Sequence, residues 1–402
     1  MRNRAIIGRG VGAASLAAAL GCLQPGIDPI YLTVLSDARP VPLEAHGLVV
    51  GFTQAGSALG ALTIWRLGAV LPRWTVLAAA VLAFLCSVAV IVADSLPTVL
   101  ACRVGYGLAM GVIYATTMAA YAARRPNKAY GAVYLTQLIL STVVSLALPE
   151  LMLVAGAEAA LMAMVLVPAF ALVTLVPFVR SASMIDGAVD GAGDGMPGAA
   201  TGRSAVPAAG WALAAATFWF ICSTMLVWSF SAALATRAGI ADRTIGQAVA
   251  IGSVVGALTA AAVMRERLLV PLPVTALLSG LALASPVVLT MPGADGAYVA
   301  SIVLLNIGST AIIIRCSGLA TATSRDSRFR VFVACTHSLG LIAGPLLGTA
   351  MMALFGREGL LIGVALALTG GLVSVGWAVR AGFAEATRPS PEKGGAPVPI
   401  GA

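Results

Sequence analysis

Long apolar runs separated by short polar breaks make up almost the whole chain. Each run is continuously apolar over about 20 residues, the length that crosses the hydrocarbon core of a bilayer, and lacks the alternation of a barrel strand. The pattern therefore predicts an all-α membrane protein. Its twelve transmembrane helices are expected near residues 9–35, 45–69, 74–93, 97–121, 130–154, 157–179, 208–235, 244–264, 268–291, 297–320, 331–355 and 359–380.

The composition excludes a water-soluble globule. The 402 residues are 59% hydrophobic and 10% charged, whereas soluble domains carry roughly 25% charged residues. We therefore expect an integral multi-pass protein of the cytoplasmic (inner) membrane. The amino end, MRNRAIIGRGVGAASLAAAL, has the basic start and apolar run of a signal peptide, but no polar mature domain follows it. We expect it to remain as the first span.

The basic residues predict the direction of the spans. With the amino terminus in the cytoplasm, eighteen of the 24 Lys and Arg residues fall in cytoplasmic segments and four in outer segments, while Arg103 and Arg315 lie inside spans. Lys and Arg are enriched on the cytoplasmic side of membrane proteins, so both chain ends are expected there. The formal charge of +8 is spread over short turns without a basic face, which argues against a nucleic-acid partner.

One long polar segment divides the spans into two sets of six. Residues 181–207 are rich in Gly and Ala, and their acids lack the alternate spacing of a calcium loop. We expect a six-helix bundle over 1–180, a flexible cytoplasmic linker over 181–207, a second six-helix bundle over 208–381 and a disordered cytoplasmic tail over 382–402.

A short repeat indicates that the two bundles are pseudo-symmetric. GSALGALT begins at Gly56 and GSVVGALT at Gly252, and each falls on the second helix of its half. Gly56 and Gly60, like Gly252 and Gly256, form a small-xxx-small stripe that lets a neighbouring backbone approach closely. Parallel halves related by an axis along the membrane normal would place the two stripes symmetrically.

These features resemble the major facilitator superfamily of secondary transporters, in which a cytoplasmic linker joins two six-helix halves. Arg103 and Gly107 in RVGYGLAMG match the family's R-x-x-x-G pattern on helix four, and the resemblance implies a part in proton coupling for this arginine. The family's G-x-x-x-D-R-x-G-R-R loop is degraded in ALTIWRLGAV, where Arg66 and Gly68 match but Trp65 replaces the acid. The family's gating ion pair therefore does not transfer to this chain.

A second family element occurs at an unusual place. GLIAGPLLG puts Gly344 and Pro345 on helix eleven, whereas antiporters of the family carry a G-x-x-x-G-P element on helix five. Proline removes a backbone donor, so we expect a bend or a packing contact at this site rather than a sign of antiport.

Ionisable residues within the spans are few, and each costs about 2.5–3.5 kcal/mol on insertion scales. Asp28, late in the first span, and Arg103, early in the fourth, are expected at similar depth in the outer third of the membrane. One hypothesis pairs them at a central cavity, where Asp28 exchanges a proton as the carrier changes state. The alternative is that Pro25 and Pro29 end the helix and expose Asp28 to external water.

Two further residues are expected in the inner thirds of helices ten and eleven. Arg315 either extends to the cytoplasmic headgroups or binds substrate, and His337 is either a hydrogen-bonded packing residue or a cavity residue. Together in the cavity, they would favour an anionic substrate. Neutral candidates for the cavity, of which Tyr31 and Trp228 are alternatively interfacial anchors, are Gln24, Tyr31, Gln54, Tyr114, Gln137, Trp228 and Asn306.

The leading interpretation is a proton-coupled secondary transporter that exports a small amphipathic organic molecule by alternating access. Import of an organic anion or metabolite is one alternative, and a transport-dead receptor or scaffold is another. A membrane enzyme is disfavoured because no catalytic set of His or Asp residues stands out in the spans, and no P-loop indicates ATP-driven pumping. We expect a monomer in the lipid bilayer whose partners are protons and the substrate, without a cofactor or a metal.

Overall fold

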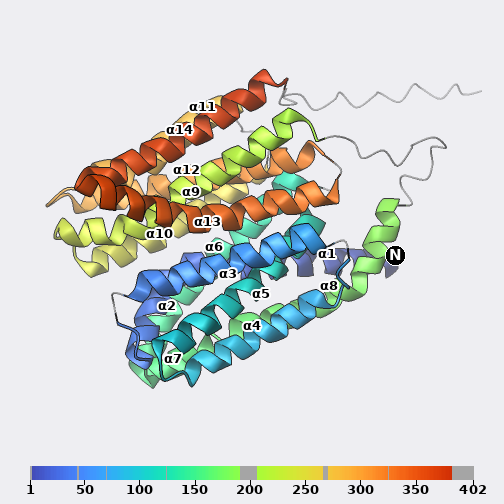
Figure 1. The fold of residues 1–402 in the computed structure, drawn as a ribbon, viewed down its shortest axis with the longest axis horizontal. Helices are drawn as coiled ribbons and strands as arrows, with labels where there is room; N and C mark the ends of the chain where they lie inside the picture. Colours follow the sequence, from blue (N-terminus) through green and yellow to red (C-terminus); the bar gives the residue numbers. More distant parts are fainter. Residues whose placement is uncertain are drawn as a thin grey trace, which may run out of the picture.

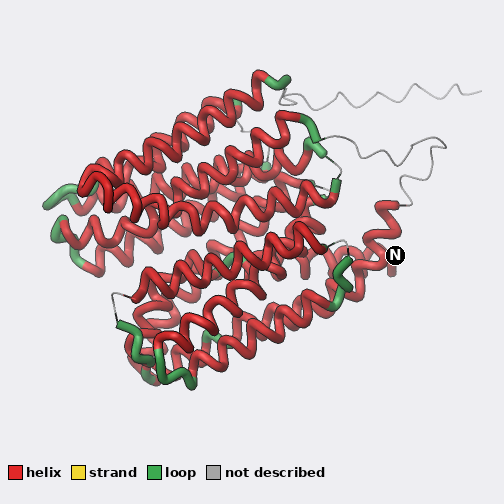
Figure 2. Tube along the Cα trace, viewed as in Figure 1, coloured by secondary structure: helices red, strands yellow, loops and turns green. Residues whose placement is uncertain are grey.

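The chain folds into helices throughout its described part. The computed structural model describes residues 2–42, 45–68, 70–123, 125–190, 206–265, 270–324 and 326–382. Within them are fourteen α-helices, one short 3-10 helix and no strand, so the all-α prediction is confirmed for these residues (Figure 2). The predicted flexible part of the linker after Asp190 and the predicted tail after Gly382 lie outside the described residues.

The first half contains eight helices, because two of its six predicted spans are broken. The 9–35 span is interrupted at Cys22 and Leu23, and the 157–179 span is interrupted at Met164 and Val165. The helices are α1 (Arg2–Gly21), α2 (Gln24–Ala38), α3 (His46–Leu67), α4 (Thr75–Ile91), α5 (Leu96–Ala122), α6 (Pro126–Ala155), α7 (Ala157–Ala163) and α8 (Leu166–Asp190). Helix α8 thus includes the first ten residues of the range expected as a linker.

The second half contains six helices, one for each predicted span. They are α9 (Ala208–Arg237), α10 (Asp242–Met264), α11 (Leu272–Leu289), α12 (Asp295–Ala322), α13 (Ser327–Phe355) and α14 (Gly359–Arg380), with the 3-10 helix η2 (Gly356–Glu358) before the last. Pro345 lies inside α13 without ending it.

Length and composition place this fold in a membrane. Ten helical segments of the described chain are long and apolar enough to cross a bilayer, and Gly12–Gly21 and α4 are shorter apolar helices. Large apolar side chains cover the outside of the bundle; Val154 and Leu153, for example, are 85% and 79% exposed. Such a surface is favourable in lipid and costly in water, so the protein is an integral multi-pass membrane protein. The count of twelve spans stays a prediction.

The two halves form two bundles that lie side by side (Figure 1). The start of α1 and the end of α14 are at the same end of the molecule, which we call the inner end because the basic residues predict that it faces the cytoplasm. The helices run back and forth between this end and the opposite, outer end. The first and last described helices therefore begin and end on one side of the bundle, and the cytoplasmic location of both chain ends stays a prediction.

The glycines of the first repeat bring two helices into backbone contact. A Cβ atom added at Gly56 or Gly60 would lie 2.2 or 2.0 Å from the carbonyl oxygen of Val104 or Leu108 on α5. Gly107 on α5 has the reciprocal contact with the carbonyl of Thr53 at 2.0 Å. Only hydrogen fits at these positions, and the two helices pack as a close pair.

The glycines of the second repeat are packed differently. A Cβ atom at Gly252 would meet the Asn306 side chain at 2.6 Å, and one at Gly256 would meet Leu138 at 3.2 Å. The neighbours are side chains rather than backbone, so the expectation of two equivalent close backbone contacts is wrong for α10. The physical reason is that Asn306 occupies the space that a second backbone would need.

Gly344 makes a third close approach, between α13 and α9. A Cβ atom there would lie 2.4 Å from the carbonyl oxygen of Cys222. The Gly-Pro element on helix eleven therefore serves packing within the second half.

Candidate functional site

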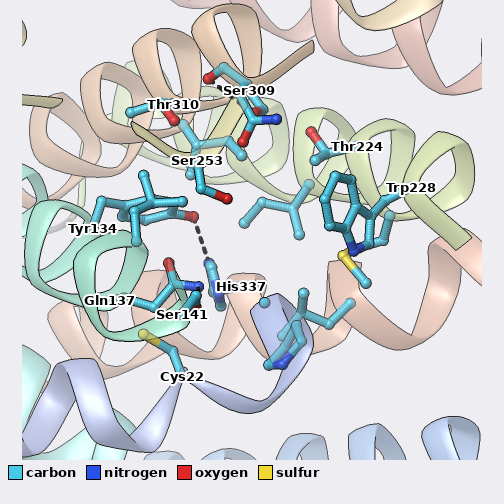
Figure 3. Close-up of a pocket in the computed structure, with 18 of the residues that line it drawn as sticks. Cys22, Tyr134, Gln137, Ser141, Thr224, Trp228, Ser253, Ser309, Thr310 and His337 are labelled. Carbon is cyan, nitrogen blue, oxygen red and sulfur yellow. Dashed lines mark hydrogen bonds between the residues drawn. The ribbon is translucent and has the colours of Figure 1, made fainter. Parts of the chain in front are cut away.

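A central cavity lies between the two halves (Figure 3). It contains about 710 Å³ of space that is not filled by atoms, counting its open mouth. Both halves contribute residues to its wall. The lining residues are Cys22, Pro25 and Gly26 around the start of α2, Tyr134, Gln137, Leu138 and Ser141 of α6, Ile221, Thr224, Met225 and Trp228 of α9, Ser253 of α10, Leu305, Asn306, Ser309, Thr310 and Ile313 of α12, and His337 and Leu341 of α13.

A histidine and a tyrosine meet across this cavity. The hydroxyl of Tyr134 and Nδ1 of His337 are 3.1 Å apart and form a hydrogen bond, drawn as a dashed line in Figure 3. The His337 ring also stacks at a tilt on Tyr114, with ring centroids 5.2 Å apart. The imidazole is therefore held from two helices of the first half while it belongs to the second half.

The remaining polar groups of the cavity are neutral. Ser309 and Thr224 donate to backbone carbonyl oxygens of their own helices, and Asn306 donates from Nδ2 to the carbonyl of Ile302 at 2.9 Å. Among the lining residues, which all belong to the described chain, there is no Asp, Glu, Lys or Arg. The cavity thus offers several hydrogen-bonding groups in a mainly apolar wall.

A smaller space, which we call the side chamber, adjoins the central cavity. The two share Cys22, Pro25, His337 and Leu341 in their linings. The other side-chamber residues are Gly21, Gln24, Thr53, Gln54, Ser57, Tyr106, Gly107, Met110, Tyr114 and Ser338. The side chamber is more polar than the cavity and reaches into the first half.

Asp28 is buried beside this chamber. Only 7% of the residue is exposed, and its Oδ1 accepts a hydrogen bond of 2.7 Å from Nε2 of Gln24. Helix α2 starts at Gln24, takes Pro25 into its first turn and continues through Asp28. The span is thus interrupted next to Pro25, but the exposure of Asp28 to external water is wrong, because a proline is tolerated in the first turn of a helix and α2 continues through a buried Asp28.

Arg103 neighbours Asp28 without forming an ion pair with it. Its Nε donates to the hydroxyl of Thr53 at 2.9 Å, and its guanidinium carbon lies 4.5 and 4.6 Å from the ring centroids of Tyr31 and Tyr106. The charge of Arg103 still acts on the Asp28 carboxyl. A hydroxyl and two aromatic faces hold the cation, and the predicted direct pair is not formed in this conformation.

Arg315 lies away from the cavity. It is 2% exposed, and its Nη1 donates to the carbonyl oxygen of Val270 at 2.7 Å and to the hydroxyl of Thr275. These contacts fix the start of α11 to α12. Neither expectation for this arginine, headgroup contact or substrate binding, fits the structure, because the side chain is buried, lies outside the cavity lining and donates from Nη1 to acceptors inside the second half.

The other candidate residues line the central cavity, the side chamber or a third, smaller space. Gln137, Trp228, Asn306 and His337 line the central cavity. Gln24, Gln54 and Tyr114 line the side chamber, and Tyr31 lies with Arg103 in a third, smaller space that Gln24 also borders. Several residues that line the central cavity were not predicted from the sequence: Tyr134, Ser141, Thr224, Ser253, Ser309 and Thr310. Of these, Tyr134 lies one helical turn from the predicted residue Gln137.

The halves touch along a line that we call the inner seam, where α3 and α13 run antiparallel. Ser57 and Ser338 hydroxyls are 3.4 Å apart, and the thiol of Cys335 donates to the carbonyl of Ala61 at 3.0 Å. One turn further towards the inner end, the Trp65 ring lies 5.4 Å from the ring of Phe332. The seam follows the inner part of both helices.

Aromatic side chains extend the seam at the position of the degraded family loop. The ring of Phe332 also contacts Trp211 of α9 at 5.0 Å, and the guanidinium of Arg66 lies 4.9 Å from the Trp65 ring. Arg66 thus rests on the residue that replaces the family's acid. Gly68 follows the end of α3, and its amide bonds the carbonyl of Ile64 at 2.8 Å.

Helix α6 makes further contacts between the halves near the inner end. Thr321 of α12 donates to the hydroxyl of Tyr130 at 3.4 Å, and a Cβ atom at Gly318 would lie 2.0 Å from Oδ1 of Asn127. Gly131 approaches Met264 of α10 in the same way. These contacts and the inner seam all lie on the inner side of the central cavity.

The comparisons with known proteins identify the fold. No protein-family model matches the chain, and no curated protein sequence matches it. The crystal structure of a bacterial homologue of the iron transporter ferroportin, in an outward-facing state with soaked iron, has a TM-score of 0.64 and 14% sequence identity, covering 94% of this chain and 99% of that chain. The chain thus shares the fold of this matched structure, which is that of a transporter homologue.

Proposed function

We propose that this protein is a proton-coupled secondary active transporter that exports a small, uncharged amphipathic organic molecule by alternating access. The observation that carries the proposal is the central cavity: it lies between two halves, both halves line it, and its lining holds neutral polar groups without a carboxylate, Lys or Arg. Pockets for small organic ligands have this makeup, with a mainly apolar wall and a few placed polar groups.

The contacts between the halves support alternating access. The inner seam and the contacts of α6 close the inner side of the cavity through side chains and close helix packing, with no covalent link. In a carrier, the halves rock about the central site so that one side closes as the other opens. We therefore assign this conformation to an outward-facing state, with both chain ends in the cytoplasm.

The cavity chemistry favours an amphipathic cargo over an anion. Import of an organic anion relied on Arg103 or Arg315, and neither lines the central cavity. Trp228 and the aliphatic wall suit an apolar body, while Gln137, Asn306 and His337 suit a polar end. The matched transporter structure contains iron, but the described residues of this chain include no group of three or more His, Cys, Asp or Glu placed to hold a metal ion.

Asp28 is the proposed proton carrier. It is a buried carboxyl near the cavity, because Gln24, which bonds it, borders the side chamber that adjoins the cavity. A buried carboxyl with a nearby cation can gain and lose its proton as its surroundings change. Exchange of this proton as the halves rock would couple transport to the pH gradient.

Reconstituted vesicles test the function. Purified full-length protein would be placed in vesicles with a trapped pH dye and challenged with neutral amphipathic, anionic and ferrous compounds. We expect proton flux with neutral amphipathic compounds, and loss of that flux in Asp28→Asn. The matched control is Asp37→Asn, an exposed acid on the same helix, which should keep the flux. Absence of flux with every compound would favour a receptor or scaffold instead.

A further inference from the structure

The side chamber contains buried polar atoms that no protein group satisfies. Gln54 and Tyr114 line it and are each 2% exposed. Within the described chain, neither Nε2 of Gln54 nor the hydroxyl of Tyr114 has a protein hydrogen-bond partner. Leaving such groups unsatisfied costs about 1–3 kcal/mol each, so a chamber lined by them is a site for a small polar ligand.

The Asp28 carboxyl next to the chamber also has an oxygen without a protein hydrogen-bond partner. Its Oδ1 is bonded by Gln24, and the amide of Gln54 also faces it, yet Oδ2 makes no hydrogen bond with the described protein groups. Gln54 and Tyr114 thus line the chamber, and the Asp28 carboxyl lies behind Gln24 and Gln54, two lining residues whose side chains interact with it. This set is complementary to water, which both donates and accepts.

The size of the chamber also favours water. The space between its side chains leaves room for about one water molecule. His337 lines both the chamber and the central cavity, and Tyr114 stacks on His337. The ring pair therefore stands where the two spaces adjoin.

We propose that the side chamber binds ordered water and that this water carries protons between the central cavity and Asp28. The proposal rests on the proton-coupled transport proposed above. A proton from the cavity passes to chamber water, which releases one of its own protons to Oδ2 of Asp28, and the reverse sequence returns it. Asp28 then exchanges protons with the space that the cargo occupies, so that cargo and proton compete for access.

The surroundings of Asp28 leave few other partners for this exchange. The charged and titratable groups that act on it are Arg103 and Tyr106 of α5 and Tyr31 of its own helix. Helix α3 contributes the neutral Gln54 and Thr53, and α6 presents the neutral Gln137 and Ser141 next to Gly26. On α7, Glu158 instead pairs with Arg39 at 3.1 Å, at the exposed outer end.

Infrared difference spectroscopy on full-length protein in lipid vesicles tests the route. The pH of the buffer is stepped, and the carbonyl band of protonated Asp28, recognised by its loss in Asp28→Asn, is followed in time. We expect Tyr114→Phe and Gln54→Leu each to slow the change of this band about tenfold, because each removes a hydrogen bond from the relay. Tyr114→Phe is the safer variant, since the hydroxyl it removes has no protein partner to lose.

The matched control is Tyr121→Phe, the same change on the same helix at a residue outside both linings, which should leave the rate unchanged. Rates that stay at the wild-type value in both chamber variants would overturn the water route while leaving proton-coupled transport in place. Equal slowing in Tyr121→Phe would also overturn it. If the wild-type protein showed no Asp28 band, both proposals would be wrong: Asp28 as the proton carrier and the water route to it.

Discussion

The hydroxyl of Tyr134 bonds Nδ1 of His337 across the central cavity, at 3.1 Å, and so ties α6 of the first half to α13 of the second. Because Tyr114 stacks on the other side of the imidazole, His337 is oriented by two residues of the opposite half. A ligand in the cavity meets a ring whose position depends on how the halves are arranged.

We therefore expect Tyr134→Phe to weaken binding of any compound that elicits flux. Loss of one hydrogen bond is worth about 1 kcal/mol, which is about a fivefold change in affinity. The affinity would be measured from the concentration dependence of flux in vesicles, with Tyr121→Phe as the control. An unchanged affinity would show that the cargo does not use this ring.

The inner seam predicts that a cross-link between the halves stops transport. In a background without native cysteines, Trp65→Cys and Phe332→Cys would be joined by a short bifunctional maleimide, since the native rings lie 5.4 Å apart. We expect flux to fall to background on cross-linking, while each single variant treated alike keeps it. Full transport by the cross-linked protein would contradict the assignment of the seam as a gate.

Cys335 reports opening of the same seam. Its thiol is buried, with no exposed surface, against the carbonyl of Ala61 in the opposite half. In a variant whose only cysteine is Cys335, a water-soluble maleimide should react slowly at rest and faster under conditions that drive transport. Cys222, which is 1% exposed and packed within the second half, is the matched control and should remain unreactive. Equal labelling of the two would argue against separation of α3 from α13.

The two glycine repeats should respond differently to the same substitution. Gly60→Ala puts a Cβ atom 2.0 Å from the backbone carbonyl of Leu108, which cannot move without shifting α5. We expect a loss of stability of about 1–3 kcal/mol, measured as a lower thermal unfolding midpoint in detergent.

Gly252→Ala meets the side chains of Asn306, at 2.6 Å, and Ile302, at 3.2 Å, and Asn306 makes room only by giving up its hydrogen bond to the Ile302 carbonyl. We expect a smaller loss of stability than in Gly60→Ala but altered cargo affinity, because Asn306 lines the central cavity. If both variants unfolded at the same lowered temperature, the distinction between backbone and side-chain contact would be wrong.

The helices were predictable because long apolar runs dominate the chain, but their interruptions were not. The break at Cys22 and Leu23 lies directly before Pro25, one of the two prolines that the sequence offers as a helix end, but the sequence does not show that a helix resumes at Gln24 and buries Asp28. That break nevertheless positions Cys22 and Pro25 at the boundary between the cavity and the side chamber. Tertiary packing, which a one-dimensional pattern does not contain, determines where such a helix is interrupted.

The candidate site was likewise predicted only in part from the sequence. The rarity of polar residues in apolar runs identified Gln54, Gln137 and His337, because lipid gives such groups no partner. The same reasoning misplaced Arg315, whose acceptor on Val270 precedes a different helix and is brought near only by the fold. It also could not show that Arg103 would rest on aromatic rings instead of pairing directly with Asp28.

The inner seam is built from hydroxyls, a thiol and aromatic rings, and no contact across it joins two opposite charges in the described chain. Ion pairs near a surface weaken as salt rises, whereas apolar contact weakens on cooling. The resting balance between the two orientations of the proposed carrier should therefore be nearly independent of ionic strength and should shift with temperature instead.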